Sequence, residues 1–282
     1  MTDFPTGKKH VSYSEIKNWK ECAYRHKLQQ IDKIDMFSPS PFLDYGTIVH
    51  AGCEHFLKTR EIDTETVERE LRLAWEKQGF DDPENAWRAN PPGWYKYEPI
   101  DTWVNWAKTC LTDLPAFMEE TFPGWKYVAA EEELYELIPK DVMKFKGFID
   151  GIIRTKTKSG KSKAYILDWK TAGAKGWHYQ KRKDWLMHAQ LAMYKNFWSR
   201  KHNISPDDIK NIQCGFILLK RGGPPGDSCE LLKVSVGPTT AMRADRLVTD
   251  MIKTVRKGLF IKNRNSCKYC DYKDTVHCPS GG

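Results

Sequence analysis

The segment YILDWKTAG, residues 165–173, combines the pattern of a buried strand with two charged side chains. Because successive side chains of a strand point to opposite faces, Asp168 and Lys170 share one face and Trp169 takes the other. Charged groups inside a protein are costly unless they are paired or bind a metal ion. The segment therefore predicts either a reactive carboxylate and amine or a solvated ion pair at a strand end.

A second carboxylate, Asp150, ends the apolar pattern of FKGFIDGII in the preceding predicted strand. The two strands are expected to form a hairpin, so that Asp150 and Asp168 could meet at one edge of the sheet. Neighbouring carboxylates repel each other, and a hard cation such as Mg²⁺ removes the repulsion while retaining sites for water and phosphate. Lys170 could then orient or deprotonate an attacking water or stabilise the phosphate. The combination indicates metal-dependent hydrolysis of phosphodiester bonds.

Two helical segments carry further polar candidates. His50 lies in GTIVH, and its imidazole could complete a metal site. Gln190 and Tyr194 lie four residues apart in QLAMY, so they share one face of a helix. Considered separately, a helical histidine is commonly structural and a tyrosine commonly packs in the core. The order of all four patterns along the chain is more informative than any one of them.

This order resembles the RecB-like branch of the PD-(D/E)XK nuclease superfamily, which shows G-x-x-x-H, G-x-I-D, D-x-K and Q-x-x-x-Y in succession. The matching segments here are GTIVH, GFID, DWK and QLAMY. The resemblance implies a restriction-endonuclease-like α/β fold and a Mg²⁺ or Mn²⁺ site. Its implied metal ligands are His50, Asp150, Asp168 and the backbone carbonyl of Trp169.

The resemblance also assigns roles to other residues. Lys170 would be the catalytic lysine, and Gln190 and Tyr194 would act near the DNA. The basic pair Lys220 and Arg221 is a further candidate for DNA contacts. One acidic residue ahead of the G-x-I-D strand could join the site, and the candidates are Glu131, Glu132 and Glu133.

The cysteines separate into two groups. Cys53, Cys110, Cys214 and Cys229 occur singly and are expected to be buried thiols. Cys267, Cys270 and Cys278 form C-x2-C-x7-C, and Cys22 lies near the N-terminus. One early cysteine with a C-terminal trio resembles the iron–sulfur subgroup, which includes CRISPR-associated RecB-like exonucleases and AddB-type nuclease domains. The resemblance implies a 4Fe–4S cluster, and zinc held by four cysteines or by three with His277 is the alternative.

The remaining pattern predicts one α/β nuclease domain over residues 1–282 with a mixed sheet. Helices are expected over 13–31, 45–60, 64–80, 102–122, 185–202 and 239–257, and strands over 128–139, 142–155, 163–171, 212–221 and 229–237. The hairpin turn is expected around Ser159 and Gly160. Residues 258–282 are expected to form the cysteine segment that closes on Cys22.

Residues 61–127 are expected to form a helical insertion rich in aromatic side chains. These could pack in a core or offer a platform on which nucleic-acid bases stack. The aromatic residues are Trp75, Trp87, Trp94, Tyr95, Tyr97, Trp103, Trp106 and Trp125.

The net charge of +8 and a pI near 8.9 are compatible with a polyanionic partner. No apolar run is long enough to span a bilayer, and no secretory signal is evident. A cytoplasmic location is therefore expected, and the protein could be encoded by a phage. No nucleotide-binding loop typical of helicases is present, so a helicase or recombination partner would be a separate protein.

These features together predict a DNA exonuclease that acts on ends or single strands in recombination, replication, repair, CRISPR adaptation or phage DNA processing. The alternatives are a structure-selective endonuclease and a non-catalytic DNA-binding module with a structural metal.

Overall fold

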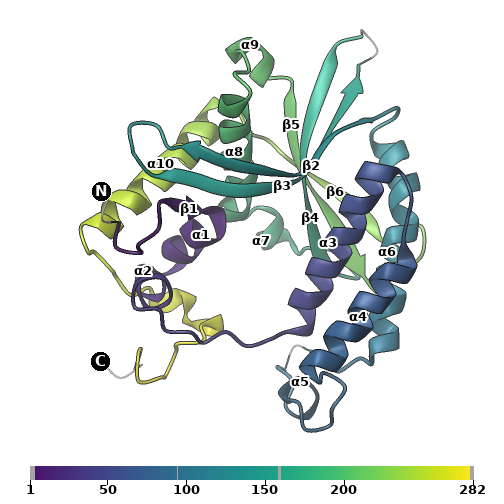
Figure 1. Cartoon of the computed structure of the whole chain (residues 1–282), viewed down its shortest axis with the longest axis horizontal. Helices are drawn as coiled ribbons and strands as arrows, with labels where there is room; N and C mark the ends of the chain where they lie inside the picture. The colour runs from purple at the N-terminus through teal and green to yellow at the C-terminus, as the bar shows by residue number, and fades with distance from the viewer. Residues whose placement is uncertain (1–3, 94, 158–159, 280–282) are drawn as a thin grey trace.

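A six-stranded mixed β-sheet separates the helices of the computed structural model into two groups (Figure 1). The structure describes residues 4–93, 95–157 and 160–279. The spatial order is β1–β3–β4–β5–β6, with β2 antiparallel to β3; β1 runs parallel to β3 and β4 runs parallel to β5. The strands are β1 (His10–Ser12), β2 (Lys126–Leu137), β3 (Lys144–Lys156), β4 (Ser162–Gly173), β5 (Ile212–Arg221) and β6 (Cys229–Val234). This is the predicted α/β class with a mixed sheet.

One face of the sheet packs against α1, α8 and α10, and the other packs against α3, α4 and α6. The longer helices are α1 (Tyr13–Glu21), α3 (Pro41–Thr59), α4 (Thr64–Gln78), α6 (Ile100–Thr121), α8 (Trp185–Lys201) and α10 (Pro238–Arg256). The short ones are α2 (Ala23–His26), α5 (Ala86–Ala89), α7 (Tyr179–Arg182), α9 (Pro206–Ile209), the π-helix η1 (Lys27–Ile31) and the 3₁₀ helix η2 (Arg264–Tyr269). None of the helices in the described ranges is both long and apolar enough to cross a membrane.

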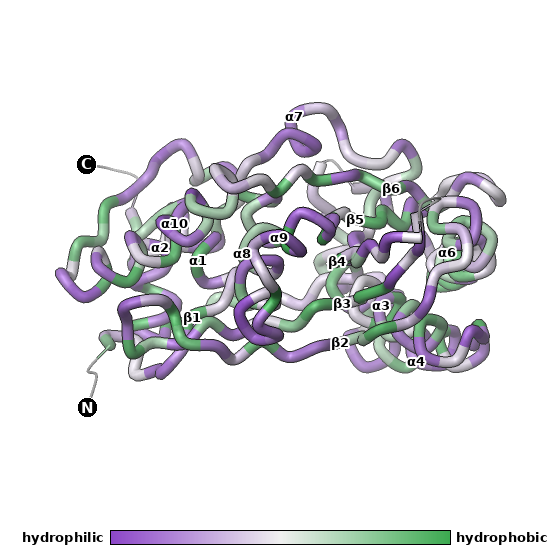
Figure 2. Tube along the Cα trace, turned by 90° about the horizontal axis from the view of Figure 1, so that it is seen from above, coloured by the Kyte–Doolittle hydropathy of each residue, from purple (hydrophilic) through white to green (hydrophobic). Residues whose placement is uncertain are grey.

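Alternation along β4 positions the reactive side chains. Ile166 lies in the core beside α8, whereas Leu167 and Trp169 lie in the core on the α3 side. Asp168 and Lys170 therefore share the face of Ile166, as the two-residue period of a strand requires. Figure 2 shows the hydrophobic residues of the central strands in the interior, with hydrophilic segments at α7 and α9. The predicted split of Asp168 and Lys170 from Trp169 is confirmed.

The N-terminal region departs from the expected single helix over 13–31. The helix stops at Cys22, whose backbone is extended (φ −159°), and a new turn starts at Ala23. The Sγ atom of Cys22 accepts a hydrogen bond from the Arg25 backbone N–H at 3.5 Å. The sequence pattern also missed β1, because three residues are too few to show a strand period. The break leaves Cys22 between two helical segments rather than inside one.

The aromatic region packs into the core on the α3 side. Trp75 and Trp103 are buried, with ring centroids 5.2 Å apart. Trp125 is buried as well, and the Arg60 guanidinium lies 3.2 Å from its ring centroid. These rings are therefore not free to stack on bases. The expected residues Trp94 and Ser159 lie outside the described residues.

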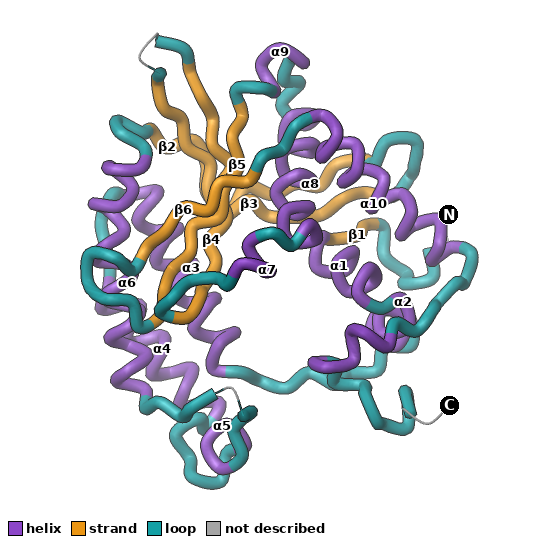
Figure 3. Tube along the Cα trace, turned by 180° about the vertical axis from the view of Figure 1, so that it is seen from behind, coloured by secondary structure: helices purple, strands orange, loops and turns teal. Residues whose placement is uncertain are grey.

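Residues 32–40 form an irregular linker between η1 and α3 (Figure 3). The Tyr272 hydroxyl donates a hydrogen bond to the Ile34 carbonyl at 2.6 Å. At the other end of the linker, Trp87 Nε1 donates to the Pro39 carbonyl at 2.8 Å. The linker is thus anchored by side chains from the C-terminal segment and from α5.

Candidate functional site

The two candidate carboxylates lie where β3 and β4 diverge. Backbone pairing between the strands runs from Lys156 to Gly151, which lies opposite Leu167. Immediately beyond this pair, Asp150 Oδ2 accepts a hydrogen bond from the Trp169 backbone N–H at 2.8 Å. The carboxylate thus takes the place of the backbone carbonyl that would accept this hydrogen bond in a continuous sheet. The expected meeting place at one edge of the sheet is wrong, because β3 and β4 are interior strands.

A glycine lets α3 approach this fork. A Cβ atom at Gly151 would lie 2.7 Å from Leu57 Cδ1, and Leu57 is a fully buried residue of α3. The same helix carries His50, whose Nδ1 lies 3.6 Å from Asp150 Oδ2. Burial, and then the charge of Lys170, lowers the pKa of His50 to about 4. The imidazole is therefore neutral near pH 7, which is the form that binds a metal.

Asp168 is held on both carboxylate oxygens. Its side chain is 1% exposed. Oδ1 accepts a hydrogen bond from Gln190 Nε2 at 2.7 Å, and Oδ2 forms an ion pair with Lys170. Burial raises the pKa of Asp168, and burial followed by the charge of Asp168 raises the pKa of Asp150 well above its usual value. A buried carboxylate that disfavours the charge of its partly buried neighbour forms a site that a cation would stabilise.

The helical pair Gln190 and Tyr194 lies behind Asp168. Gln190 Nε2 also donates to the Tyr194 hydroxyl at 3.2 Å, and both residues are buried. Tyr194 packs near Phe145, with ring centroids 6.4 Å apart. The expected direct action near DNA is not what these contacts describe. Gln190 orients Asp168, and Tyr194 supports Gln190 from the core.

The three candidate glutamates are separated by their surroundings. Glu131 lies at the exposed rim of the site, where loss of hydration and the charges of Glu54 and Asp168 raise its pKa. Glu132 instead binds His202 and Lys201 at 2.6 and 2.9 Å. Glu133 lies 3.8 Å from Lys146. Glu131 has the unusual φ of +51°, so its direction depends on a backbone feature that sequence reasoning could not see.

Sequence reasoning missed Glu54. It lies four residues after His50 on α3, and therefore on the same face of that helix. Its charge contributes to the raised pKa of Glu131. The four-residue spacing from His50 was the available signal.

One known family of enzymes matches almost the whole chain. A family model for the PD-(D/E)XK nuclease superfamily matches residues 10–276. The chain belongs to the PD-(D/E)XK nuclease superfamily. Members of this superfamily use divalent metals such as Mg²⁺ or Mn²⁺, and their mixed sheet flanked by helices is the fold observed here.

One solved structure shares this fold. The chain is similar to the crystal structure of a candidate exonuclease from Eubacterium rectale, with 12% identity and a TM-score of 0.51 over 96% of this chain and 92% of that chain. A second structure, SSO0001, has 14% identity and a TM-score of 0.34 over 80% of this chain and 92% of that chain. No curated protein matches significantly.

The candidate DNA contacts Lys220 and Arg221 do not face the fork of this superfamily site. Lys220 is buried and its Nζ lies 2.7 Å from Asp227 Oδ1. The Arg221 guanidinium lies over the rings of Phe42, Tyr45 and Trp103, with the nearest ring centroid at 4.5 Å. The sequence placed both at a strand end but could not show that their side chains turn inward.

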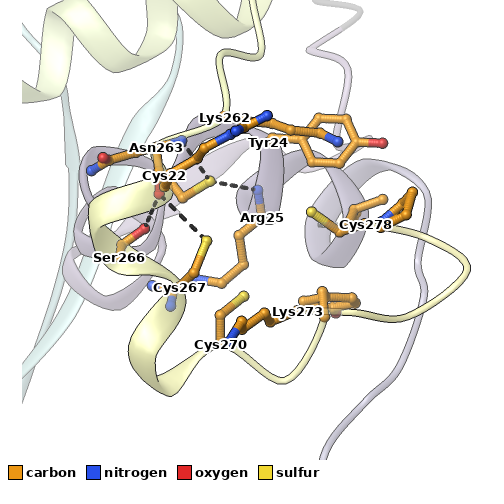
Figure 4. Close-up of a pocket in the computed structure, with 14 residues that line it drawn as sticks. Cys22, Tyr24, Arg25, Lys262, Asn263, Ser266, Cys267, Cys270, Lys273 and Cys278 are labelled. Atoms are coloured by element: carbon orange, nitrogen blue, oxygen red, sulfur yellow. Dashed lines mark hydrogen bonds between the residues drawn. The ribbon is translucent and has the colours of Figure 1, made fainter. Parts of the chain in front are cut away.

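Cys22, Cys267, Cys270 and Cys278 line one cavity of about 240 Å³. Figure 4 shows the four sulfur atoms directed into this space from the junction of α1 and α2, from η2 and from the loop beyond it. Cys22 Sγ accepts hydrogen bonds from the backbone N–H groups of Arg25 and Asn263, each at 3.5 Å. The predicted convergence of the early cysteine and the C-terminal trio is therefore present as a shared pocket. His277 is absent from the residues that line it.

Neither location is a preformed metal site. Within the described ranges, no three His, Cys, Asp or Glu side chains already stand at metal-binding spacing. At the fork, the donors that could close on a cation are the oxygens of Asp150 and Asp168 and the neutral imidazole of His50. The four remaining cysteines lie elsewhere as buried free thiols, as expected for Cys53, Cys110, Cys214 and Cys229.

Proposed function

We propose that the protein is a divalent-metal-dependent deoxyribonuclease that removes nucleotides from DNA ends or single strands. The observation that carries the proposal is the fork, where the partly buried Asp150 lies beside the buried Asp168 and both have raised pKa values. A hard cation would relieve that mutual destabilisation and leave positions for water and phosphate oxygens.

The donor set fits such a cation. Asp150 and Asp168 supply carboxylate oxygens, and the low pKa of His50 keeps its imidazole available as a neutral ligand. The Trp169 carbonyl remains a proposed fourth donor. When bound, the metal supplies Lewis-acid charge and lowers the pKa of coordinated water.

The protein's own groups would orient the reaction. Gln190 fixes the rotation of Asp168 through the hydrogen bond to Oδ1. Lys170 lies on the same face, with 24% of its side chain exposed, so its amine can reach a phosphate or an attacking water from the solvent side. Glu131 at the rim is the proposed proton acceptor, because its raised pKa makes it a stronger base than an ordinary glutamate.

The likeness to a candidate exonuclease supports action at ends, and the basic net charge supports binding of the phosphate backbone. We propose that residues 61–127 are an insertion within one nuclease domain. The processes proposed for the protein are recombination, replication, repair, CRISPR adaptation and phage DNA processing. We also propose a separate helicase as its partner and a cytoplasmic location.

Cleavage of end-labelled single-stranded DNA with Mn²⁺ tests this function. We expect Asp168→Ala and Lys170→Ala to abolish cleavage while circular dichroism remains that of the wild type. Circular single strands should resist the enzyme if it needs an end, and cutting of circles would favour the endonuclease alternative. Equal cleavage by wild type and both variants would overturn the proposal.

We also propose that Cys22, Cys267, Cys270 and Cys278 bind a 4Fe–4S cluster, with zinc as the alternative. Four thiols on one cavity suit either group. The N–H groups of Arg25 and Asn263 would stabilise a Cys22 thiolate. Arg25, Lys262 and Lys273 also line the cavity and would offset the negative charge of four thiolates.

Colour and metal content distinguish the two centres. Protein purified without oxygen should absorb broadly near ~400 nm, as thiolate-bound iron–sulfur clusters do. Colourless protein with one equivalent of zinc would replace the cluster by zinc and leave the nuclease proposal untouched. Protein that contains neither iron nor zinc would overturn both the cluster and the zinc assignment.

A further inference from the structure

A groove of about 350 Å³ adjoins the carboxylate fork and shares His50 and Lys170 with it. Its walls come from elements that are far apart in the sequence: α1 contributes Lys17, the start of α3 contributes Phe42 and Leu43, and α7 contributes Lys181. We call this the basic groove. Because it opens beside Lys170, anything bound in it lies next to the groups that would act on a phosphodiester.

The basic groove concentrates positive charge. Lys17, Lys170 and Lys181 all line the groove, and burial, followed by the charges of Lys17 and Lys170, lowers the pKa of Lys181. Lys181 Nζ lies 4.5 Å from the ring centroid of Trp177 and, among the described residues, forms no ion pair. Lys17 Nζ lies 3.9 Å from Glu21 Oε1 and 3.8 Å from Met187 Sδ, and Met187 also lines the groove. Such a cluster is stabilised by an anion that bridges the walls.

The wall formed by the start of α3 is apolar. Leu43 is 54% exposed there, and Phe42 beside it is only partly buried. The Phe42 ring is fixed by edge contacts with Tyr95 and Trp103 and by the guanidinium of Arg221, which lies 4.5 Å from its centroid. An apolar wall facing lysines matches a nucleotide, which has a flat base on one side and a phosphate on the other.

The volume of the groove fits one nucleotide, and the need for an accessible base favours a single strand. A cavity of this size accommodates a ligand of nucleotide dimensions. In a duplex the bases are paired and stacked, so they are not available to the wall of Phe42 and Leu43.

We propose that the basic groove holds the single-stranded DNA next to the scissile phosphate, with Lys17 and Lys181 as positioning residues for its backbone. The inference rests on the proposed nuclease function and adds the strand state of the substrate and two residues outside the superfamily pattern.

The salt dependence of binding tests the two lysines without catalysis. Anisotropy of a labelled oligo(dT) of about 12 nucleotides is measured in EDTA over a series of salt concentrations. Each lysine–phosphate ion pair that is removed from a complex with a single strand reduces the slope of log K against log salt by about 0.7. We therefore expect Lys17→Gln and Lys181→Gln each to lower the slope by about 0.7, and the double variant by about 1.4.

The matched control is Lys233→Gln, an exposed lysine at β6 that does not line the groove. This variant should keep the wild-type slope. Lys181→Arg should keep it as well, because arginine retains the positive charge that glutamine lacks. Wild-type slopes in both glutamine variants would overturn the inference, as would an equal loss of blunt-duplex binding. Since no metal is present, either result is independent of the cleavage test with Asp168→Ala, whose failure would instead overturn the nuclease function.

Discussion

The carboxylate fork and the cysteine pocket are built in opposite ways. At the fork, two interior strands, α3 and α8 bring the side chains together, and Asp168 is 1% exposed. At the cysteine pocket, three of the four thiols belong to η2 and an irregular loop, and those three are partly exposed. The fork is supported by the hydrophobic core, whereas the pocket joins two distant parts of the chain.

The two regions therefore differ in whether the site forms before or together with the binding of its metal. Sheet register places Asp150 beside Trp169 before any cation arrives. In the pocket, the Asn263 N–H donates to Cys22 Sγ at 3.5 Å and the Asn263 side chain donates to the Glu21 carbonyl at 2.8 Å, which ties the end of α1 to the C-terminal segment. We therefore expect metal at the fork to serve chemistry and metal at the pocket to serve folding.

The largest expected effect comes from Cys22→Ala. Structural metal sites in small domains contribute on the order of 10 kcal/mol of folding free energy, so loss of a ligand should cost several kcal/mol. Chemical denaturation with metal analysis measures this. Cys214→Ala is the matched control, because it removes a buried core thiol and should keep the metal at a cost of about 1 kcal/mol. If Cys22→Ala keeps the stability and the metal content of the wild type, the metal at the cysteine pocket does not serve folding.

Next in size is stabilisation of the folded chain by Mn²⁺ at the fork. At a metal concentration about 100 times Kd, binding to the native state alone adds about 2.7 kcal/mol. Thermal unfolding should show this rise in wild type and not in Asp168→Ala. A similar rise in that variant would place the bound ion elsewhere.

Gly151→Ala probes the close approach of α3 to the fork. Its Cβ would press on Leu57, and overpacking of this kind costs roughly 1–3 kcal/mol. Because α3 carries His50, Mn²⁺ affinity measured by calorimetry should fall as well. Gly93→Ala, which meets nothing within 4 Å, should change neither quantity. Wild-type stability in Gly151→Ala would mean that α3 is not rigidly placed.

The smallest expected effect is at Glu132, which ties β2 to α8. Partial burial raises its pKa, but hydrogen bonds from His202, Lys201 and Trp198 outweigh this and hold the pKa below its usual value. The resulting stability is present above the usual pKa of about 4.3 and is lost as the pH falls below it.

Glu132→Gln should therefore lower the unfolding free energy by up to about 1 kcal/mol at pH 7 and by less at pH 4. Urea denaturation at both pH values measures this, with Glu133→Gln as the control. A constant difference between the two pH values would show that the carboxylate charge is not the cause.

The sequence predicted the elements with strong periodicity and the residues that depend only on local pattern. Asp168 and Lys170 share a face because strand alternation is local. Asp150 could be assigned to the neighbouring strand, but its meeting place at the fork depends on where pairing ends, which no local pattern encodes.

The remaining differences arise from tertiary contacts. Lys220 and Arg221 look exposed in a sequence, yet Asp227 and three aromatic rings hold them inside. Gln190 and Tyr194 have the predicted spacing, but packing of α8 against the sheet turns them toward Asp168. The positive φ of Glu131 is likewise a consequence of strand geometry rather than of residue type.

The anchored linker has a consequence for synthesis of the chain. The Tyr272 hydroxyl that binds the Ile34 carbonyl is 238 residues further along the sequence. In a nascent chain Trp87 can tie the Pro39 end of the linker early, but the Ile34 end has to wait for Tyr272 until every strand has been translated. During that interval, residues 32–40 should be the preferred point of proteolytic attack, and their protection should appear late.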